Sequence, residues 1–304
     1  LAEAHFSPND YDGIWASCPA INWTQFLASG LWAVTVMNEY DHILGFHKIN
    51  AFRDAVHNSV GGKENYFQVE ERIDFDPYTI LGQKTKGGKI TEKDCLVMQE
   101  IWKGPHTTGN DFLWYSFLPG GTFWNKIIPI GSFYYPLIGK RPKCFSLVEQ
   151  YVHLAFEDPK KDLLHLKIRD FEKVFDTCIR KLGWLSCDHA DLRPFANAGG
   201  KLIIDHGLDD PLIPVEGTID YYHHMREIHG GQNFIDRFCR LYINPGDGHG
   251  NCHTNGPGMT ESTGIQALMN WVEHNKAPEN LPAVLVNQKT GKTIRKGIVK
   301  PWRV

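Results

Sequence analysis

Residues 199–210 read GGKLIIDHGLDD, and this stretch decides how the C-terminal part of the chain folds. The apolar run LII is short and lies between glycines, which is typical of a strand buried on both faces in a parallel sheet. The residues after it predict a loop, a helix over 217–229, a second strand in DRFCRLYIN (236–244) and a helix in TGIQALMNWVEHN (263–275). This order predicts a parallel α/β sheet with right-handed crossovers.

Two further elements extend this prediction. The N-terminal residues indicate a short helix that ends near Ser7, followed by a short buried strand over residues 13–16. The helix predicted over 263–275 is amphipathic, and its apolar face is formed by Ile265, Leu268, Met269 and Val272.

Chemically reactive side chains follow both predicted C-terminal strands. Asp209 and Asp210 come shortly after the first, and His249 lies in the loop INPGDGHGNCHTNGPG (243–258) after the second. Functional side chains of such sheets sit on loops at the carboxyl ends of the strands, so an acid and an imidazole meet at one edge. An acid followed by a histidine is the order found in α/β-hydrolases, where the carboxylate orients the imidazole. From the residues alone, capping or turn formation by Asp210 and loop stabilisation by His249 stay open.

The composition bounds the classes of function. The chain has 304 residues, 42% of them hydrophobic and 22% charged, which is typical of a globular protein with a sizeable core. A formal net charge of −3 offers no basic face for nucleic acid. No apolar run approaches the roughly 20 residues of a membrane span. Seven cysteines make an odd number, so we expect one thiol to be free or paired outside the chain.

Five separated motifs resemble the tannase and feruloyl esterase family of α/β-hydrolases. They are YDGIWASCPAINW (11–23), ITEKDCLVMQEIWKGP with FLWYSFLPGG (90–121), the stretch 199–222, RLYINPGDGHGNC with GPG (240–258), and ALMNWVEHNKAPENLPA (267–283). The resemblance implies a partial α/β-hydrolase core that lacks its N-terminal strands and carries a large inserted lid. We expect the core in residues 1–20 and 197–304, and the lid in residues 21–196.

The resemblance also implies a reaction. It assigns the catalytic acid to Asp210 and the catalytic base to His249, in a Ser-Asp-His hydrolysis of small aromatic esters of phenolic acids such as ferulate or gallate. It makes Cys252 the cysteine that bridges to the nucleophile loop, although Gly250 and Asn251 separate it from His249. It implies a secreted protein, and no signal peptide is visible in the sequence.

The nucleophile itself has no candidate in this sequence. No Gly-x-Ser-x-Gly occurs, and no serine follows a cysteine. The stretch Ser262-Thr263-Gly264 lies before a helix and is interpreted as its N-cap. We therefore expect this to be the C-terminal portion of a longer esterase, with the serine and the oxyanion hole supplied by an upstream segment or chain. The printed residues alone are not expected to turn over ester.

No cofactor is required by this mechanism, but the family resemblance raises the question of calcium. In the matching stretch VHNSVGGKEN (56–65), valine replaces a cysteine and another valine replaces an aspartate, so the site is expected to be degraded. Its positions are Val56, His57, Val60 and Glu64. Calcium could otherwise use Asp54, Glu64, Asp74 or backbone carbonyls.

Two other functions stay open from the sequence. One is a catalytically inactive relative that binds aromatic ligands under an aromatic-rich lid. The other is a metal-dependent hydrolase in which zinc is bound by His249, Cys252 and His253, with His206 or Asp205 as a further donor.

Overall fold

The computed structural model describes residues 1–60, 66–67, 73–121, 145–251, 256–287 and 289–303. The chain forms two compact units, one made of residues 1–21, 61–71 and 187–304 and the other of residues 22–60 and 72–186. We call the first the core unit and the second the inserted unit. Tyr66 and Phe67, which we expected in the insertion, group with the core unit. The role of the inserted unit as a lid stays a prediction.

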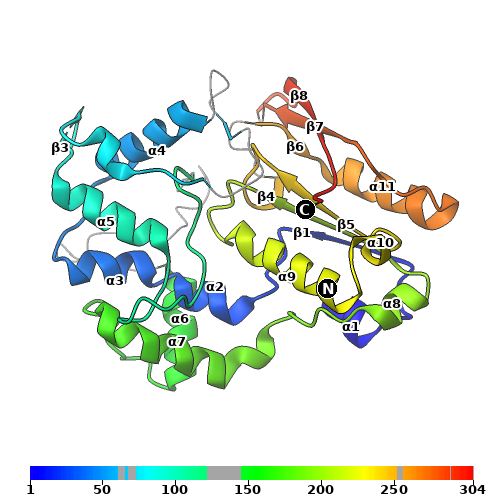
Figure 1. The fold of residues 1–304 in the computed structure, drawn as a ribbon, viewed down its shortest axis with the longest axis horizontal. Helices are drawn as coiled ribbons and strands as arrows, with labels where there is room; N and C mark the ends of the chain where they lie inside the picture. The colour runs from blue at the N-terminus through cyan, green and yellow to red at the C-terminus, as the bar shows by residue number, and fades with distance from the viewer. Residues whose placement is uncertain (61–65, 68–72, 122–144, 252–255, 288, 304) are drawn as a thin grey trace. The chain divides into compact units, whose positions relative to one another are not determined.

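The core unit carries the predicted succession of strands and helices (Figure 1). Its elements are α1 (Ala2–Phe6), β1 (Gly13–Ser17), α8 (Arg193–Asn197), β4 (Lys201–Gly207), α9 (Val215–Ile228), α10 (Gln232–Ile235), β5 (Cys239–Asn244), the short 3-10 turn η4 (His249–Asn251), β6 (Gly258–Met259), α11 (Glu261–His274), β7 (Leu281–Val286) and β8 (Thr293–Val299).

Strands β1, β4 and β5 form a parallel sheet, as predicted, and their order in it is β1-β4-β5. Successive side chains of a strand point to opposite faces of the sheet. On one face Ile203 and Tyr242 pack with Trp271 of α11. On the other face His206 meets Thr218 of α9, at 2.8 Å between its Nδ1 and the hydroxyl oxygen. Helices α9 and α11 therefore cover opposite faces of β4.

Only part of the apolar face that we predicted for helix α11 packs against the core. Ile265 is 49% exposed and Met269 is 51% exposed, whereas Gly264, Ala267 and Trp271 are buried. A Cβ atom added to Gly264 would lie 2.8 Å from the Trp15 ring, so the missing side chain permits the contact. The helix is capped by Thr260, whose hydroxyl accepts the Thr263 N–H, and not by Ser262 or Thr263.

A second, antiparallel sheet in the order β6-β7-β8 was not predicted from the sequence. It joins the parallel sheet through a bridge between Pro301 and Tyr242 of β5, and through the Trp302 N–H, which donates to the Leu241 carbonyl at 2.7 Å. Met259, Ala283 and Val299 contribute to the same apolar cluster as Ile203 and Tyr242. The C-terminal residues thus help to build the core.

The core unit closes the point where the insertion leaves and returns. The Cys187 N–H donates to the Ile21 carbonyl at 2.8 Å, so residues 166 positions apart (187 − 21) are joined. Tyr66, in the segment that returns to the core unit, packs its ring against Gly246 and Gly256, and the Arg295 guanidinium lies 5.0 Å from its centre.

The inserted unit is mainly helical in its described parts (Figure 1). Its elements are α2 (Trp23–Ser29), α3 (Trp32–Glu39), α4 (Phe46–Val60), the 3-10 helix η2 (Pro77–Ile80), the two-residue strands β2 (Lys84–Thr85) and β3 (Gly88–Lys89), α5 (Glu92–Lys103), α6 (Ser146–Phe156), α7 (Ile168–Leu182) and the 3-10 helix η3 (Gly183–Leu185). Within the described residues, none of the helices has both the length and the apolar character needed to span a bilayer.

Candidate active site

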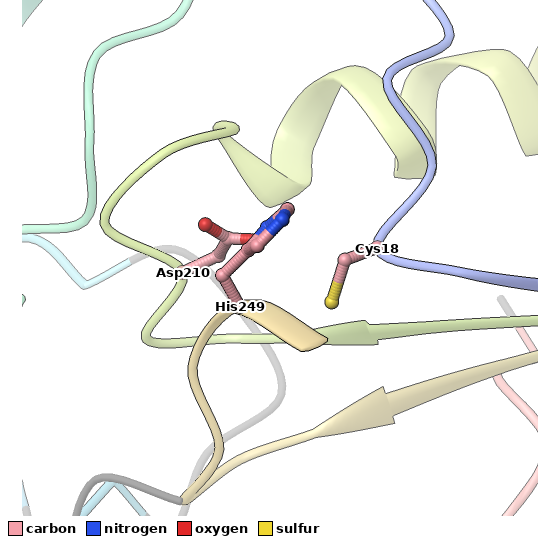
Figure 2. Close-up of side chains that lie close together, drawn as sticks. All are labelled: Cys18, Asp210 and His249. Carbon is pink, nitrogen blue, oxygen red and sulfur yellow. The ribbon is translucent and has the colours of Figure 1, made fainter. Parts of the chain in front are cut away.

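The carboxyl ends of β1, β4 and β5 bring three chemically reactive side chains together (Figure 2). Cys18 follows β1 directly, Asp210 lies three residues beyond the end of β4, and His249 lies five residues beyond the end of β5. Their possible ligand atoms lie within 4.8 Å of one another. The predicted meeting of Asp210 and His249 at one edge of the sheet is therefore present.

Asp210 is the acid that faces His249. The His249 Nδ1–H donates to Asp210 Oδ2 at 2.8 Å, and the His206 Nε2–H donates to the same oxygen at 3.0 Å. The other oxygen, Oδ1, accepts the backbone N–H groups of Leu212 at 2.7 Å and Ile213 at 3.0 Å. The carboxyl group is fully buried and all four bonds favour its anionic form.

These contacts shift the pKa values of both partners. Burial by itself raises the pKa of Asp210, but the hydrogen bonds from His206 and His249 outweigh it and hold that pKa well below its usual range. Burial by itself lowers the pKa of His249, but the hydrogen bond to Asp210 and the charge of Asp210 outweigh it and raise that pKa. A permanently charged acid beside a half-exposed, more basic imidazole can activate a hydroxyl group.

His206 is a residue of the site whose role was not predicted from the sequence. It lies on β4, four positions before Asp210, and its side chain is completely buried. Because a strand side chain next to the carboxyl end can reach the loop that follows, this position on β4 is a signal that could have identified it. His206 connects Thr218 of α9 to Asp210.

The loop that carries His249 crosses directly over β4. A Cβ atom added to Gly207 would lie 2.3 Å from the Gly248 carbonyl oxygen and 2.4 Å from that of Asp247, so only glycine fits there. The Asp209 N–H donates to the Asp247 carbonyl at 3.0 Å. The acid loop and the histidine loop are therefore held together by their backbones as well as by the pair of side chains.

Cys18 is a second residue that the sequence analysis did not assign to the site. The signal was its place directly after a strand of the same parallel sheet. Burial raises the pKa of its thiol well above the usual value, and the charges of Asp210 and Asp205 act in the same direction. A thiol that is only 6% exposed and remains protonated is a poor nucleophile. Cys18 is therefore not a candidate nucleophile.

The group formed by Cys18, Asp210 and His249 has donor types that zinc accepts. However, both Asp210 oxygens already accept hydrogen bonds and burial favours the protonated thiol, so a metal would have to displace these contacts. Asp205, a proposed further donor, instead accepts from Trp15 at 2.6 Å, Ser17 at 3.3 Å and Asn244 at 3.2 Å. The geometry favours the hydrogen-bonded pair over a resident metal.

Other predicted positions lie elsewhere. Cys252 and His253 lie outside the described residues, as does Glu64 of the expected calcium stretch. Val56 is fully buried against Gly120, and the His57 Nε2–H donates to the Gly120 carbonyl at 3.0 Å. The remaining positions are half-buried Val60 and the exposed Asp54 and Asp74. The five described cysteines Cys18, Cys95, Cys178, Cys187 and Cys239 are free thiols.

The sequence model of the family "Tannase and feruloyl esterase" matches residues 140–302, which include Asp210 and His249. The chain belongs to this family. A probable feruloyl esterase of Arthroderma benhamiae is 29% identical over 303 residues, covering 93% of this chain and 54% of that protein. The chain thus spans about half the length of this relative of the tannase and feruloyl esterase family.

Two solved structures of the family share the fold of this chain. Feruloyl esterase B from Aspergillus oryzae superposes with a TM-score of 0.79 at 17% identity, covering 99% of this chain and 61% of that one. Tannin acyl hydrolase from Aspergillus niger superposes with a TM-score of 0.79 at 22% identity, covering 99% of this chain and 58% of that one. The fold is of the α/β-hydrolase type.

Proposed function

We propose that this protein is a carboxylic ester hydrolase that cleaves esters of phenolic acids, such as feruloyl or galloyl esters, through an acyl-serine intermediate. The observation that carries the proposal is the 2.8 Å hydrogen bond between His249 Nδ1 and the buried Asp210 carboxylate, at the carboxyl end of a parallel sheet. Membership of the tannase and feruloyl esterase family supports the substrate class.

In this mechanism His249 Nε2 takes the proton of a serine hydroxyl while the serine oxygen attacks the ester carbonyl carbon. The resulting imidazolium is stabilised by Asp210 and returns its proton to the leaving alcohol as the bond between carbonyl carbon and alkoxy oxygen breaks. Water then enters, gives its proton to His249 and attacks the acyl-serine, and the proton returns to the serine. The acid product and the free enzyme result.

Asp210 can perform this role because it stays anionic throughout. His206 and the two backbone N–H groups hold the carboxylate in place, so it presents one oxygen to His249 Nδ1. Because Nδ1 is bound to the acid, Nε2 on the other side of the His249 ring points away from Asp210 and is the nitrogen that takes the serine proton in this proposal. We assign His206 as a positioning residue for Asp210.

The proposal includes a serine and an oxyanion hole from sequence upstream, because no Gly-x-Ser-x-Gly occurs in these 304 residues. It also includes a disulfide between Cys252 and that nucleophile loop, and secretion, both implied by family resemblance alone. The inserted unit is proposed as the lid that binds the aromatic acid. Calcium binding by the insertion is not needed for the reaction.

The test uses the natural protein with methyl ferulate and methyl gallate as probes. We expect hydrolysis of one or both, and a fall in kcat of about 10³-fold or more for His249→Ala and for Asp210→Ala. The double variant should lose little more than either single variant, because the two residues act as a unit. Far-ultraviolet circular dichroism checks that each variant folds.

The inactive relative that binds aromatic ligands makes the opposite forecast. Its wild-type protein would bind ferulate in a calorimetric titration and hydrolyse neither ester. Near-normal turnover in His249→Ala would instead remove the Asp210–His249 pair from the mechanism.

A further inference from the structure

Cys18 occupies a constrained position at the end of β1 (Figure 2). Its backbone N–H donates to the Asp205 carbonyl at 2.7 Å, which continues the pairing of β1 with β4. Its φ angle is 43°, in the left-handed region that residues other than glycine rarely adopt. This conformation is unfavourable by itself and directs the thiol toward the turn that carries His249.

The thiol contacts the peptide groups on both sides of His249. It donates to the Gly248 carbonyl at 3.7 Å, and it accepts the Gly250 N–H at 3.2 Å. Hydrogen bonds of sulfur are longer and weaker than those of oxygen, but here two of them hold the peptide groups before and after the same residue, His249. Gly250 has a φ angle of 57°, so the chain bends sharply at the second contact.

We propose that Cys18 is a positioning residue, whose thiol holds the backbone on both sides of His249 and so fixes the imidazole relative to Asp210. The inference rests on the proposed function for its role in catalysis, but the geometry it describes is independent of turnover. His249 itself is anchored by its side chain at Nδ1 and by Cys18 at its backbone. Two anchors leave the imidazole little freedom to rotate.

Burial supports this role because a protonated thiol is required. The pKa of Cys18 lies well above its usual value, so the thiol keeps the proton that it donates to the Gly248 carbonyl. The same burial makes it inert toward substrates. Loosening the turn would lengthen the His249–Asp210 hydrogen bond, and that bond is what raises the pKa of His249.

The test compares Cys18→Ala, which removes both contacts, with Cys18→Ser, which keeps a donor and an acceptor. Cys239→Ala is the matched control, because Cys239 is a fully buried thiol on β5 of the same sheet. The natural protein is assayed with methyl ferulate for kcat, KM and the pH profile of kcat/KM. Histidine-labelled protein gives the pKa of His249 by NMR, with its signal identified by its loss in His249→Gln.

For Cys18→Ala we expect kcat to fall about 10-fold with KM nearly unchanged, because a misplaced base loses rate more than binding. The acid limb of the pH profile and the NMR pKa of His249 should both move to lower pH. In Cys18→Ser, the acid limb of the pH profile and the NMR pKa of His249 should lie closer to the wild-type values than in Cys18→Ala. Cys239→Ala should lower the unfolding temperature and leave the acid limb and the pKa of His249 unchanged.

The inference is overturned if Cys18→Ala, folded by circular dichroism, keeps the wild-type NMR pKa of His249, or if Cys239→Ala shifts it equally. If Cys18→Ala does not fold, Cys18→Ser is compared with a folded Cys18→Gly variant, which lacks both contacts. The inference is then overturned if the pKa of His249 shifts equally in these two variants. If the wild type hydrolyses no ester, the proposed function fails, and the NMR comparison alone still decides the role of Cys18.

Discussion

Asp205 and Asp210 are buried carboxyl groups only five positions apart, yet their surroundings move their pKa values in opposite directions. Burial raises the pKa of Asp205 to about 6, and the hydrogen bonds from Trp15 and Ser17 only partly offset it. Asp210 gains two histidine partners, and its pKa lies well below the usual range. Because side chains alternate along β4, Asp205 faces the α11 side of the sheet, whereas His206 faces Asp210. Only the second environment favours a charged acid.

The raised pKa of Asp205 predicts a pH dependence of stability. The folded state holds the Asp205 proton up to about pH 6, whereas the unfolded state loses it near 3.8. The contribution of Asp205 to the free energy of unfolding is therefore fully present below pH 3.8 and is lost as the pH rises to about 6. A shift of this size corresponds to about 3 kcal/mol.

The measurement is the free energy of unfolding in urea at pH 4 and pH 7 for the wild type and Asp205→Asn. We expect the wild type to lose about 2 kcal/mol more than the variant over this interval, because at pH 4 the unfolded state has already begun to lose the Asp205 proton. Parallel losses in both proteins would show that Asp205 is ionised at pH 4.

Some residues of the site could be predicted from the sequence and others could not. Asp210 and His249 could be predicted because each follows a strand whose apolar run indicates that it is buried. The motifs around them also resemble those of a known family. Cys18 lies 231 positions from His249 (249 − 18), and its sequence neighbours contain no trace of the contact. His206 was considered only as a metal ligand, because its hydrogen-bonding to Asp210 depends on how the loop turns after β4.

At the scale of elements, the contact between β4 and the histidine loop leaves no room for a side chain at Gly207. Gly207→Ala would place a methyl group 2.3 Å from the Gly248 carbonyl oxygen, and backbone cannot move as a flexible side chain can. We expect the free energy of unfolding to fall by about 2 kcal/mol and activity on methyl ferulate to fall about 100-fold.

Gly45→Ala provides the control for that variant. A Cβ atom at Gly45 meets nothing within 4 Å, and its φ angle is not in the left-handed region. Its unfolding free energy should fall by no more than about 1 kcal/mol, the cost of alanine at the position before α4 whose carbonyl accepts the Ile49 N–H, with unchanged activity. Equal behaviour of the two variants would mean that the crossing of β4 by the loop is not tight in solution.

Element boundaries were predicted better than element faces. The strand predicted around the apolar run 202–204 lies within β4 (Lys201–Gly207), and the predicted helix over 217–229 overlaps α9 (Val215–Ile228). For α11 we chose large apolar residues as the packed face, and Ile265 and Met269 proved exposed. The helix packs closely against Trp15 because Gly264 has no side chain, and a pattern of hydrophobic residues does not show such a contact. In the antiparallel β6-β7-β8 sheet, Gly258 of β6 pairs with Val284 of β7 across the whole of α11, and no local pattern reveals this pairing.

At the scale of the whole molecule, the expected upstream nucleophile can be tested without any assay of activity. The mass of the natural protein is measured before and after reduction, and peptides around Cys252 are mapped. We expect a species heavier than 34.6 kDa and a Cys252 peptide cross-linked to a peptide with a Cys-Ser sequence. A Cys252 peptide that is unmodified without reductant would contradict the proposed disulfide, and a mass of 34.6 kDa would contradict the upstream serine.

The hydrogen bond between Cys187 and Ile21 has a consequence for how such proteins diversify. Because the core joins the two ends of the insertion itself, the intervening residues can be replaced by another sequence without rearranging β1 and β4. Evolution, or a protein engineer, could thus exchange the inserted unit as a whole. The exception is Tyr66, whose ring fills the space left by Gly246 and Gly256. A successful graft must carry an aromatic residue that returns to the same place.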